Sequence, residues 1–492
     1  MKFKHYLYAV AMMATLGTVA TACDDDDDNN TEIGPGGDEG TGGGDGQGTG
    51  ANITASGEVS GIWQAGSTVS VTGHITVPEG QSLTIEEGVT VVFTTEGVGT
   101  NHVPVEFIVR GNLYCKGTAE RPVLMTIPED ERTTANIHNA DHEWGGIVAY
   151  ESCEEMLIDH TVIEYTGGEV VQGSPAADAG YYEAGDDIYP QITTNNPQGR
   201  YVVTNSVIRY GQSDGIYMMG GHAIIAGNIF AGNGYDGEEA VNVKSGCIVD
   251  VARNIMYSPN TNGLKLSSGG QGGERYQAEV TAYNNTILNA GWRRDGEKGG
   301  CVYVEENVLA NVFNNMMVNC KYRAQVPGWD DPNNTDGGFD TRSVIDYNCY
   351  VSAATRSDLV IDQWEDDGEI IAGQGIDYAW KGYNYDHEDY HRAVSVAEDG
   401  VTVIPAVDAN SLIATEDNRY DPQFRNYDLE GASMKNVVYD ESWDFTPTVS
   451  LAGAYGGSEA FAQPHFATAG LNVGGQTYTS PAVGAWFGCN QP

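Results

Sequence analysis

The chain has 492 residues, with 69 acidic against 24 basic side chains and a formal net charge of −45 at pH 7. A charge this negative repels nucleic acid and anionic lipid surfaces, so we expect neither as a partner. The hydrophobic content of 40% and the 28 tyrosines argue against disorder in the body of the chain and predict one large or two ordinary domains.

Residues 1–22 have the layout of a secretory signal, because Lys2 and Lys4 precede an apolar run that is too short to span a bilayer. Ala20 and Ala22 before Cys23 resemble the lipobox of bacterial lipoproteins, and the five aspartates that follow resemble a surface-export signal of Gram-negative bacteria. These resemblances imply a lipid on Cys23 and a place on the outer face of the outer membrane. The alternative is a soluble secreted protein with an acidic tail.

Residues 23–56 are acidic and rich in Gly, and they contain almost nothing able to enter a core, so they predict a flexible tether. Seven further cysteines show no spacing of a zinc site, and most lie in strand-like runs. We expect buried free thiols rather than a framework of disulfides.

From residue 57 on, two kinds of short apolar segment alternate along the chain and recur roughly every 22 to 38 residues. The first kind is GGIVAY (145–150), DGIYMM (214–219), EAVNVK (239–244), NGLKLS (262–267) and GCVYVE (300–305). The second kind is HTVIEY (160–165), NSVIRY (205–210), GNIFAG (227–232), RNIMYS (253–258), NTILNA (285–290), NNMMVN (314–319) and YNCYVS (347–352). Stacked in parallel, equivalent strands lie about 4.8 Å apart and their inward side chains form continuous ladders.

The second position of the second segment predicts a polar ladder from coil to coil. It holds Thr161, Ser206, Asn228, Asn254, Thr286, Asn315 and Asn348. An antiparallel meander is the structural alternative, but it needs hairpin turns between adjacent strands, and the turns here join segments of different kinds.

This pattern resembles the right-handed parallel β-helix, the all-β architecture of pectate-lyase-like folds, over residues 57–355. Residues 421–430, 444–448 and 480–486 resemble the closing coils of bacterial β-helix proteins. We therefore expect residues 356–492 to form an excursion followed by closing coils and a C-terminal cap.

The outward positions of the first segment predict a binding site for an extracellular anionic polysaccharide. Nine basic against seven acidic residues between 244 and 323 form the one long positive stretch of the chain. We expect Lys244, Lys265 and Arg293 to face carboxylate or sulfate groups, and Tyr217, Trp292 and Tyr303 to pack on sugar rings. Asn242 and Glu305 complete this set as ligands of hydroxyl groups. The alternative is an ordinary solvated sheet face.

A polysaccharide lyase is a second functional hypothesis, and the resemblance implies Lys265 as base with Arg293 on the uronate carboxylate. The RxPxxR motif of pectate lyases and the GHG of polygalacturonases are absent from the sequence. Asp236, Glu238 and Glu239 offer oxygen ligands for calcium, though without a recognised loop spacing. A structural or adhesive surface protein, displaying loops such as 167–199, is the third hypothesis. Under each hypothesis we expect a monomer.

Overall fold

The structure is a computed structural model that describes residues 50–492, except 236, 295, 297–298, 328–337, 339, 358–360, 367–368, 386–392, 398, 432 and 452–462. For residues 361–366 and 369–375 it describes the backbone alone. Cys23 and the signal segment lie outside the described residues. The first strand begins at Asn52, inside the segment that the sequence predicts as a tether.

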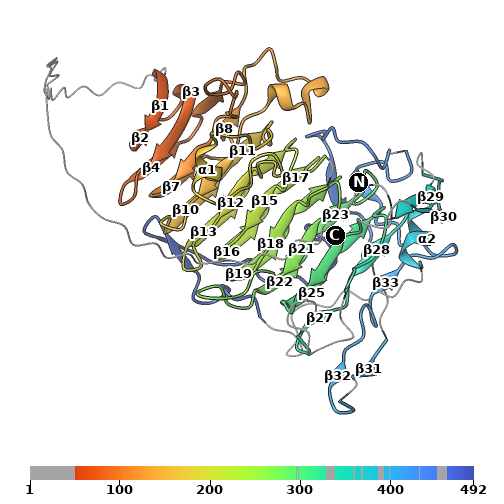
Figure 1. Ribbon diagram of the computed structural model, residues 1–492. Coiled ribbons are helices and arrows are strands. Elements are labelled where there is room, and N and C mark those ends of the chain that lie inside the picture. The colour runs from red at the N-terminus through yellow and green to blue at the C-terminus, as the bar shows by residue number, and fades with distance from the viewer. Residues whose placement is uncertain are drawn as a thin grey trace, which may run out of the picture.

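Three columns of parallel strands form the body of the protein, and most coils of the chain add one strand to each column (Figure 1). The long strands Asn52–Glu58 and Thr68–Val77 run through both the second and the first column. The first column consists of β6 (Phe107–Val109), β9 (Ile147–Ala149), β12 (Ile192–Thr194), β15 (Ile216–Met218), β18 (Val241–Val243), β21 (Leu264–Ser267) and β24 (Val302–Glu305). The second consists of β1 (Asn52–Glu58), β3 (Thr68–Val77), β5 (Thr90–Phe93), β8 (Val123–Thr126), β11 (Thr161–Glu164), β14 (Val207–Arg209), β17 (Ile229–Ala231), β20 (Ile255–Tyr257), β23 (Thr286–Leu288), β26 (Met316–Val318), β28 (Cys349–Val351) and β33 (Leu412–Ile413). The third consists of β2 (Gly61–Trp63), β4 (Ser82–Glu86), β7 (Asn112–Lys116), β10 (Glu155–Asp159), β13 (Arg200–Thr204), β16 (Gly221–Ala226), β19 (Cys247–Ala252), β22 (Glu279–Tyr283), β25 (Leu309–Phe313) and β27 (Val344–Ile345).

The predicted parallel stacking is confirmed, because the strands of the first column pair in parallel at the expected register. Ile216 pairs with Val241, Val241 with Leu264, and Leu264 with Val302, and all four side chains are buried. Two features were not predicted: the third column, and the rung β12, whose strand contains two threonines. Apolar side chains from all three columns meet in one core.

An asparagine ladder connects the coils where the third column turns into the second. The amide oxygens of Asn254, Asn285, Asn315 and Asn348 each accept the backbone N–H of the ladder residue one coil earlier. The ladder position of the fifth rung is Asn285 rather than the predicted Thr286. Asn284, with φ 51°, takes up the left-handed turn before it, so the repeat starts one residue earlier than expected.

The seven cysteines that the structure describes are buried and unpaired, as predicted. Strands contribute three of them, Cys115, Cys247 and Cys349, and the other four lie between strands or in the C-terminal segment. Each buried thiol packs as a small hydrophobic group.

Several short elements lie outside the columns. They are η1 (Thr134–Asn136), η2 (Ala140–His142), α1 (Pro175–Asp178), α2 (Ala379–Tyr383) and the antiparallel pairs β29 (Ile361–Asp366) with β30 (Glu369–Ile376) and β31 (Ser395–Val396) with β32 (Val403–Ile404). The excursion after β28 returns to the second column at β33. Among the described residues, no helix is long and apolar enough to cross a membrane.

The C-terminal segment does not form the closing coils that its sequence resembles. Its strands β34 (Phe424–Asn426) with β35 (Asp444–Pro447), and β36 (Leu471–Val473) with β37 (Gln476–Tyr478), are antiparallel hairpins. They pack against the outside of the second and third columns, as the blue segments in Figure 1 show. Apolar side chains that point outward from those columns need this cover, which explains the placement.

Candidate functional site

Four outward side chains of the first column lie in one row on consecutive rungs. Tyr217 pairs with Asn242, Asn242 with Lys265, and Lys265 with Tyr303. Adjacent strands lie about 4.8 Å apart, so residues distant in the sequence share one wall. We call this row, Tyr217 to Tyr303, the first-column face.

A cluster of three carboxyl groups lies at the strand starts that border this face. Carboxylate oxygens of Asp214, Glu238 and Glu239 all lie within 4.8 Å of one another, and we call these residues the carboxyl cluster. Asp214 and Glu239 are buried and Glu238 is exposed. The sequence analysis names Asp236, Glu238 and Glu239 as candidate calcium ligands. Asp236 lies outside the described residues.

Asp214 was missed, although a positional signal for it exists in the sequence. It stands two residues before β15, just as Glu239 stands two residues before β18. The same position before β21 holds Asn262, whose Nδ2 donates to Glu239 Oε1 at 3.1 Å. Asp214, Glu239 and Asn262, each two residues ahead of its strand, therefore form a second row beside the face.

Asn242 joins the face to the carboxyl cluster. Its Nδ2 donates to Asp214 Oδ2 at 3.1 Å and to Glu239 Oε2 at 3.4 Å. Its side chain is buried, and its Oδ1 has no hydrogen-bond partner within the part of the chain that the structure describes. Asn242 is therefore a buried group that fixes the carboxyl cluster against the strand of the face.

Lys265 is the central positive charge of the face. Its Nζ lies 3.5 Å from Glu305 Oε1 and 5.6 Å from the centroid of the Tyr303 ring. Burial alone lowers the pKa of Lys265, but the charges of Glu239 and Glu305 outweigh burial and raise that pKa above its usual value. Lys265 therefore stays an ammonium ion, which makes it a poor general base.

The pKa of Lys244 shifts in the opposite direction to that of Lys265. Burial and the neighbouring charge of Lys265 lower the pKa of Lys244, although Glu305 lies 4.0 Å from its Nζ. Of the two lysines, Lys244 is thus the one that more easily loses its proton.

Asp214 and Glu238 retain their protons more strongly than isolated carboxyl groups do. Burial, followed by the charges of Glu238 and Glu239, raises the pKa of Asp214 well above its usual value. Glu238 is exposed as a residue, but its carboxyl lies within 4.8 Å of those of the buried Asp214 and Glu239. Burial of this carboxyl and the charge of Glu239 raise the pKa of Glu238 to about 7. The cluster therefore holds dissociable protons near neutral pH beside an open surface.

The carboxyl cluster does not fit calcium as its side chains are arranged. Calcium needs several free oxygen ligands, whereas Asn242 and Asn262 direct N–H groups at the carboxylates of Asp214 and Glu239. The ammonium of Lys265 supplies positive charge at the same place. Asparagine and lysine donors thus already satisfy these carboxylates.

The structure contradicts the expectation that Trp292 and Arg293 contact the glycan. The Trp292 ring is fully buried in the core, and its Nε1 donates to the Asn319 carbonyl. The Arg293 guanidinium donates to the carbonyls of Asn233, Gly234 and Ser258 at 2.7–3.0 Å. Neither side chain faces a ligand, and the pair Lys265 and Arg293 does not supply lyase chemistry.

Arg293 instead supports the loop that carries Glu238 and Glu239. Its acceptors Asn233 and Gly234 begin this loop, which runs from β17 to β18. Arg293 is thus a positioning residue for the carboxyl cluster.

The positive stretch predicted to line the site is mostly used inside the fold. Lys321 donates to the carbonyls of Arg294 and Gly296, and Arg253 donates to the carbonyl of Ala482. Acidic side chains are therefore as prominent at the face as Lys244 and Lys265.

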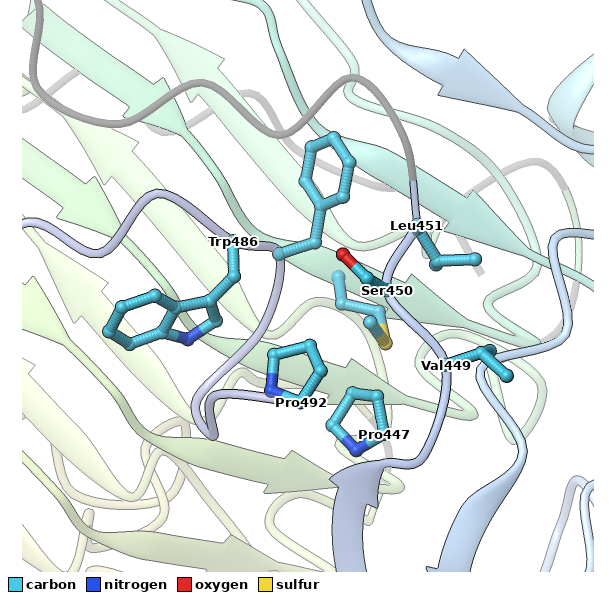
Figure 2. Close-up of a pocket in the computed structure, with 8 residues that line it drawn as sticks. Pro447, Val449, Ser450, Leu451, Trp486 and Pro492 are labelled. Carbon is cyan, nitrogen blue, oxygen red and sulfur yellow. The ribbon is translucent and has the colours of Figure 1, made fainter.

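One shallow pocket among the described residues lies elsewhere, over β26 of the second column. Figure 2 shows its lining, with Trp486 on one side and Val449 and Leu451 on the other. The residues of the face and of the carboxyl cluster do not line it.

Comparison with known proteins agrees with this architecture. Residues 54–155 match the family model of the pectate-lyase-like β-helix domain. The fold is a right-handed parallel β-helix. No curated protein and no solved structure matches the chain significantly. A domain of the pectate-lyase-like β-helix type indicates a role related to polysaccharides.

Proposed function

We propose that the first-column face binds an extracellular, anionic polysaccharide. The observation that carries this proposal is the single row of Tyr217, Asn242, Lys265 and Tyr303, with carboxyl groups along its border. Tyrosine rings pack on sugar rings, and carboxylates and amides bind hydroxyl groups. Lys265 and Lys244 supply positive charge for a carboxylate or sulfate of the glycan.

A glycan array followed by retention on the glycans that bind tests this proposal. Lys265→Met and Tyr303→Ala should each weaken binding about tenfold or more, because each removes a direct contact with the glycan. Lys116→Met is the matched control, since Lys116 is an exposed strand lysine of the third column. Unchanged retention by both face variants would remove the site.

Cleavage of a glycosidic bond is a second candidate function, and the carboxyl cluster supports it. Protonated Glu238 would give its proton to the glycosidic oxygen, which keeps the electron pair of the broken C–O bond. A carboxylate of the cluster would attack the anomeric carbon and form a glycosyl ester, because carboxyl oxygens within 4.8 Å of one another leave no room for a water between acid and base. Water would then hydrolyse this ester and lose a proton to the deprotonated Glu238, which restores the acid. Release of reducing ends from a panel of pectins, alginates and glycosaminoglycans measures this activity.

We also propose that the protein is a lipoprotein on the outer face of the outer membrane, anchored through Cys23. The layout of residues 1–28 supports this. Labelling with a fatty-acid analogue, and protease treatment of intact cells, test anchor and exposure together. Cys23→Ala should abolish the label, and a labelled protein resistant to external protease would contradict surface exposure.

A further inference from the structure

One aromatic side chain near the carboxyl cluster, Tyr235, is largely open to solvent. It is 61% exposed, and no other Phe, Trp or Tyr side chain that the structure describes is as exposed. Tyr217 and Tyr303 of the first-column face are half-buried. An exposed ring contributes little to folding, because the free energy of burial scales with the apolar area removed from water. The Tyr235 ring is therefore free to contact a ligand.

Tyr235 belongs to the loop that leads from β17 to β18 and carries Glu238 and Glu239. Gly234 and Gly237 of this loop lie against each other, since a Cβ on Gly234 would be 2.1 Å from the Gly237 carbonyl oxygen. Three peptide units join Tyr235 to Glu238, so their Cα atoms are at most about 10 Å apart. One short oligosaccharide can therefore contact both Tyr235 and the carboxyl cluster.

Hydrogen bonds fix this loop on either side of Tyr235. The Tyr235 N–H donates to the Gln212 carbonyl at 2.9 Å, and the Thr261 N–H donates to the Glu238 carbonyl at 3.0 Å. The Arg293 guanidinium binds the two carbonyls that precede Tyr235, at 2.8 and 3.0 Å. The backbone that carries the ring is thus held in place before a ligand arrives, which reduces the entropy lost on binding.

The imidazole of His138 packs against the Tyr235 ring, with the ring centroids 5.7 Å apart and an interplanar angle of 53°. His138 lies between β8 and β9, and its Nε2 donates to the Gly232 carbonyl at 2.6 Å. Burial, followed by the charge of Arg293, lowers the pKa of His138 to about 4, so the imidazole is uncharged at neutral pH. A fixed, neutral ring therefore supports Tyr235, and the rest of the tyrosine ring stays exposed.

We propose that the exposed part of the Tyr235 ring is a stacking site for one sugar ring of the glycan, beside the carboxyl cluster. The C–H groups of a pyranose pack on an aromatic face, and the carboxyl groups of the same loop bind hydroxyl groups of that sugar or of the next one. This inference rests on the proposed function and adds a contact outside the first-column face. The bound glycan then extends from the first column across the loop of Glu238 toward the second column.

Titration calorimetry of the full chain with oligosaccharides from pectin, alginate and chondroitin sulfate tests the inference. Tyr235→Ala should weaken binding about fivefold or more, whereas Tyr235→Phe, which keeps the ring, should bind within about twofold of wild type. Ile62→Ala is the matched control, because Ile62 is 60% exposed but lies on β2, in the first coils of the stack. Its affinity should equal that of wild type.

The outcomes separate this inference from the proposed function. An unchanged affinity of Tyr235→Ala, when wild type binds one of these glycans, would overturn the inference and leave glycan binding intact. An equal loss in Tyr235→Phe would also overturn it, because the effect would then belong to the hydroxyl group. Absence of binding by wild type to every glycan would overturn the proposed function and, with it, this inference.

Nitration of tyrosines gives a second readout that is independent of the affinity change. Tetranitromethane modifies exposed tyrosine rings, so Tyr235 should react first in the free protein, as measured by mass spectrometry of peptides. A saturating oligosaccharide should slow this reaction about fivefold or more, because a bound sugar covers the ring. A nitration rate that the bound oligosaccharide leaves unchanged would contradict contact between Tyr235 and the sugar.

Discussion

Lys265 and Glu305 face each other across adjacent rungs of the first column, with Nζ 3.5 Å from Oε1. The lysine charge also lies 5.6 Å from the centroid of the Tyr303 ring, on the last rung of the first-column face. Nearby, burial and neighbouring charges raise the pKa of Asp214 well above its usual value and the pKa of Glu238 to about 7. The charge of the site therefore changes with pH near neutrality.

Glycan cleavage, where present, should decrease as the pH rises through about 7. Glu238 donates a proton only in its neutral form, and its pKa is raised to about 7. Initial rates between pH 5 and 9 measure the profile. Glu238→Gln should lower the rate at least about 100-fold and flatten this limb. A profile of the same shape in Glu238→Gln would assign the titration to another group.

Calcium at millimolar concentration should leave the melting temperature unchanged. An ion that bound only the folded carboxyl cluster would raise this temperature by mass action. Differential scanning fluorimetry with calcium or EDTA measures the effect. A calcium-dependent rise that Asp214→Asn abolishes would contradict our assignment of these carboxylates to asparagine and lysine donors.

Arg293→Met should lower the free energy of unfolding by about 2–4 kcal/mol, because three carbonyl groups lose a charged donor. Chemical denaturation measures it. Arg342→Met is the control, since that guanidinium is mostly exposed, and its cost should stay within about 0.5 kcal/mol. Equal effects in both variants would contradict a supporting role for Arg293.

Asn254→Ala should cost about 2–4 kcal/mol of unfolding free energy. The substitution leaves the Asn228 N–H and the Ile225 carbonyl without their partners in a buried ladder. Asn426→Ala removes an exposed side chain that makes one bond, to the Ser442 carbonyl, and should cost less than about 1 kcal/mol. Comparable denaturation midpoints for the two variants would count against the ladder as a stabilising element.

His465 should stabilise the fold more at pH 6 than at pH 9. Burial lowers the pKa of His465, but Asp250 and Glu279 outweigh it and raise that pKa above 6.5. The stabilisation is therefore fully present below pH 6.5 and is lost as the pH rises through the folded-state pKa. Denaturation of His465→Gln beside wild type at both pH values measures the difference, and a gap that widens toward pH 9 would reverse the assigned sign.

Periodicity was enough to predict the parallel columns and the row from Tyr217 to Tyr303, because inward and outward positions alternate strictly in those strands. It failed where the pattern weakens, as at β12 with Thr193 and Thr194, and at the doubled Asn284 and Asn285. Side-chain identity alone could not separate an outward cation from a buried one, so Arg293 was placed with Lys265. Whether a cation is buried depends on residues far away in the sequence, such as the carbonyl groups of Asn233 and Gly234 that bind Arg293.

The C-terminal segment ties together coils that are far apart in the stack. The Gly474 N–H donates to Glu155, Arg253 donates to the Ala482 carbonyl, and the Cys489 N–H donates to Thr286. Repeats that touch only their neighbours can fray one at a time from an end. Here the C-terminal segment makes hydrogen bonds to several coils along the stack. Unfolding of one of these coils therefore disrupts contacts of the segment with the others. The solenoid should therefore melt as a single cooperative unit.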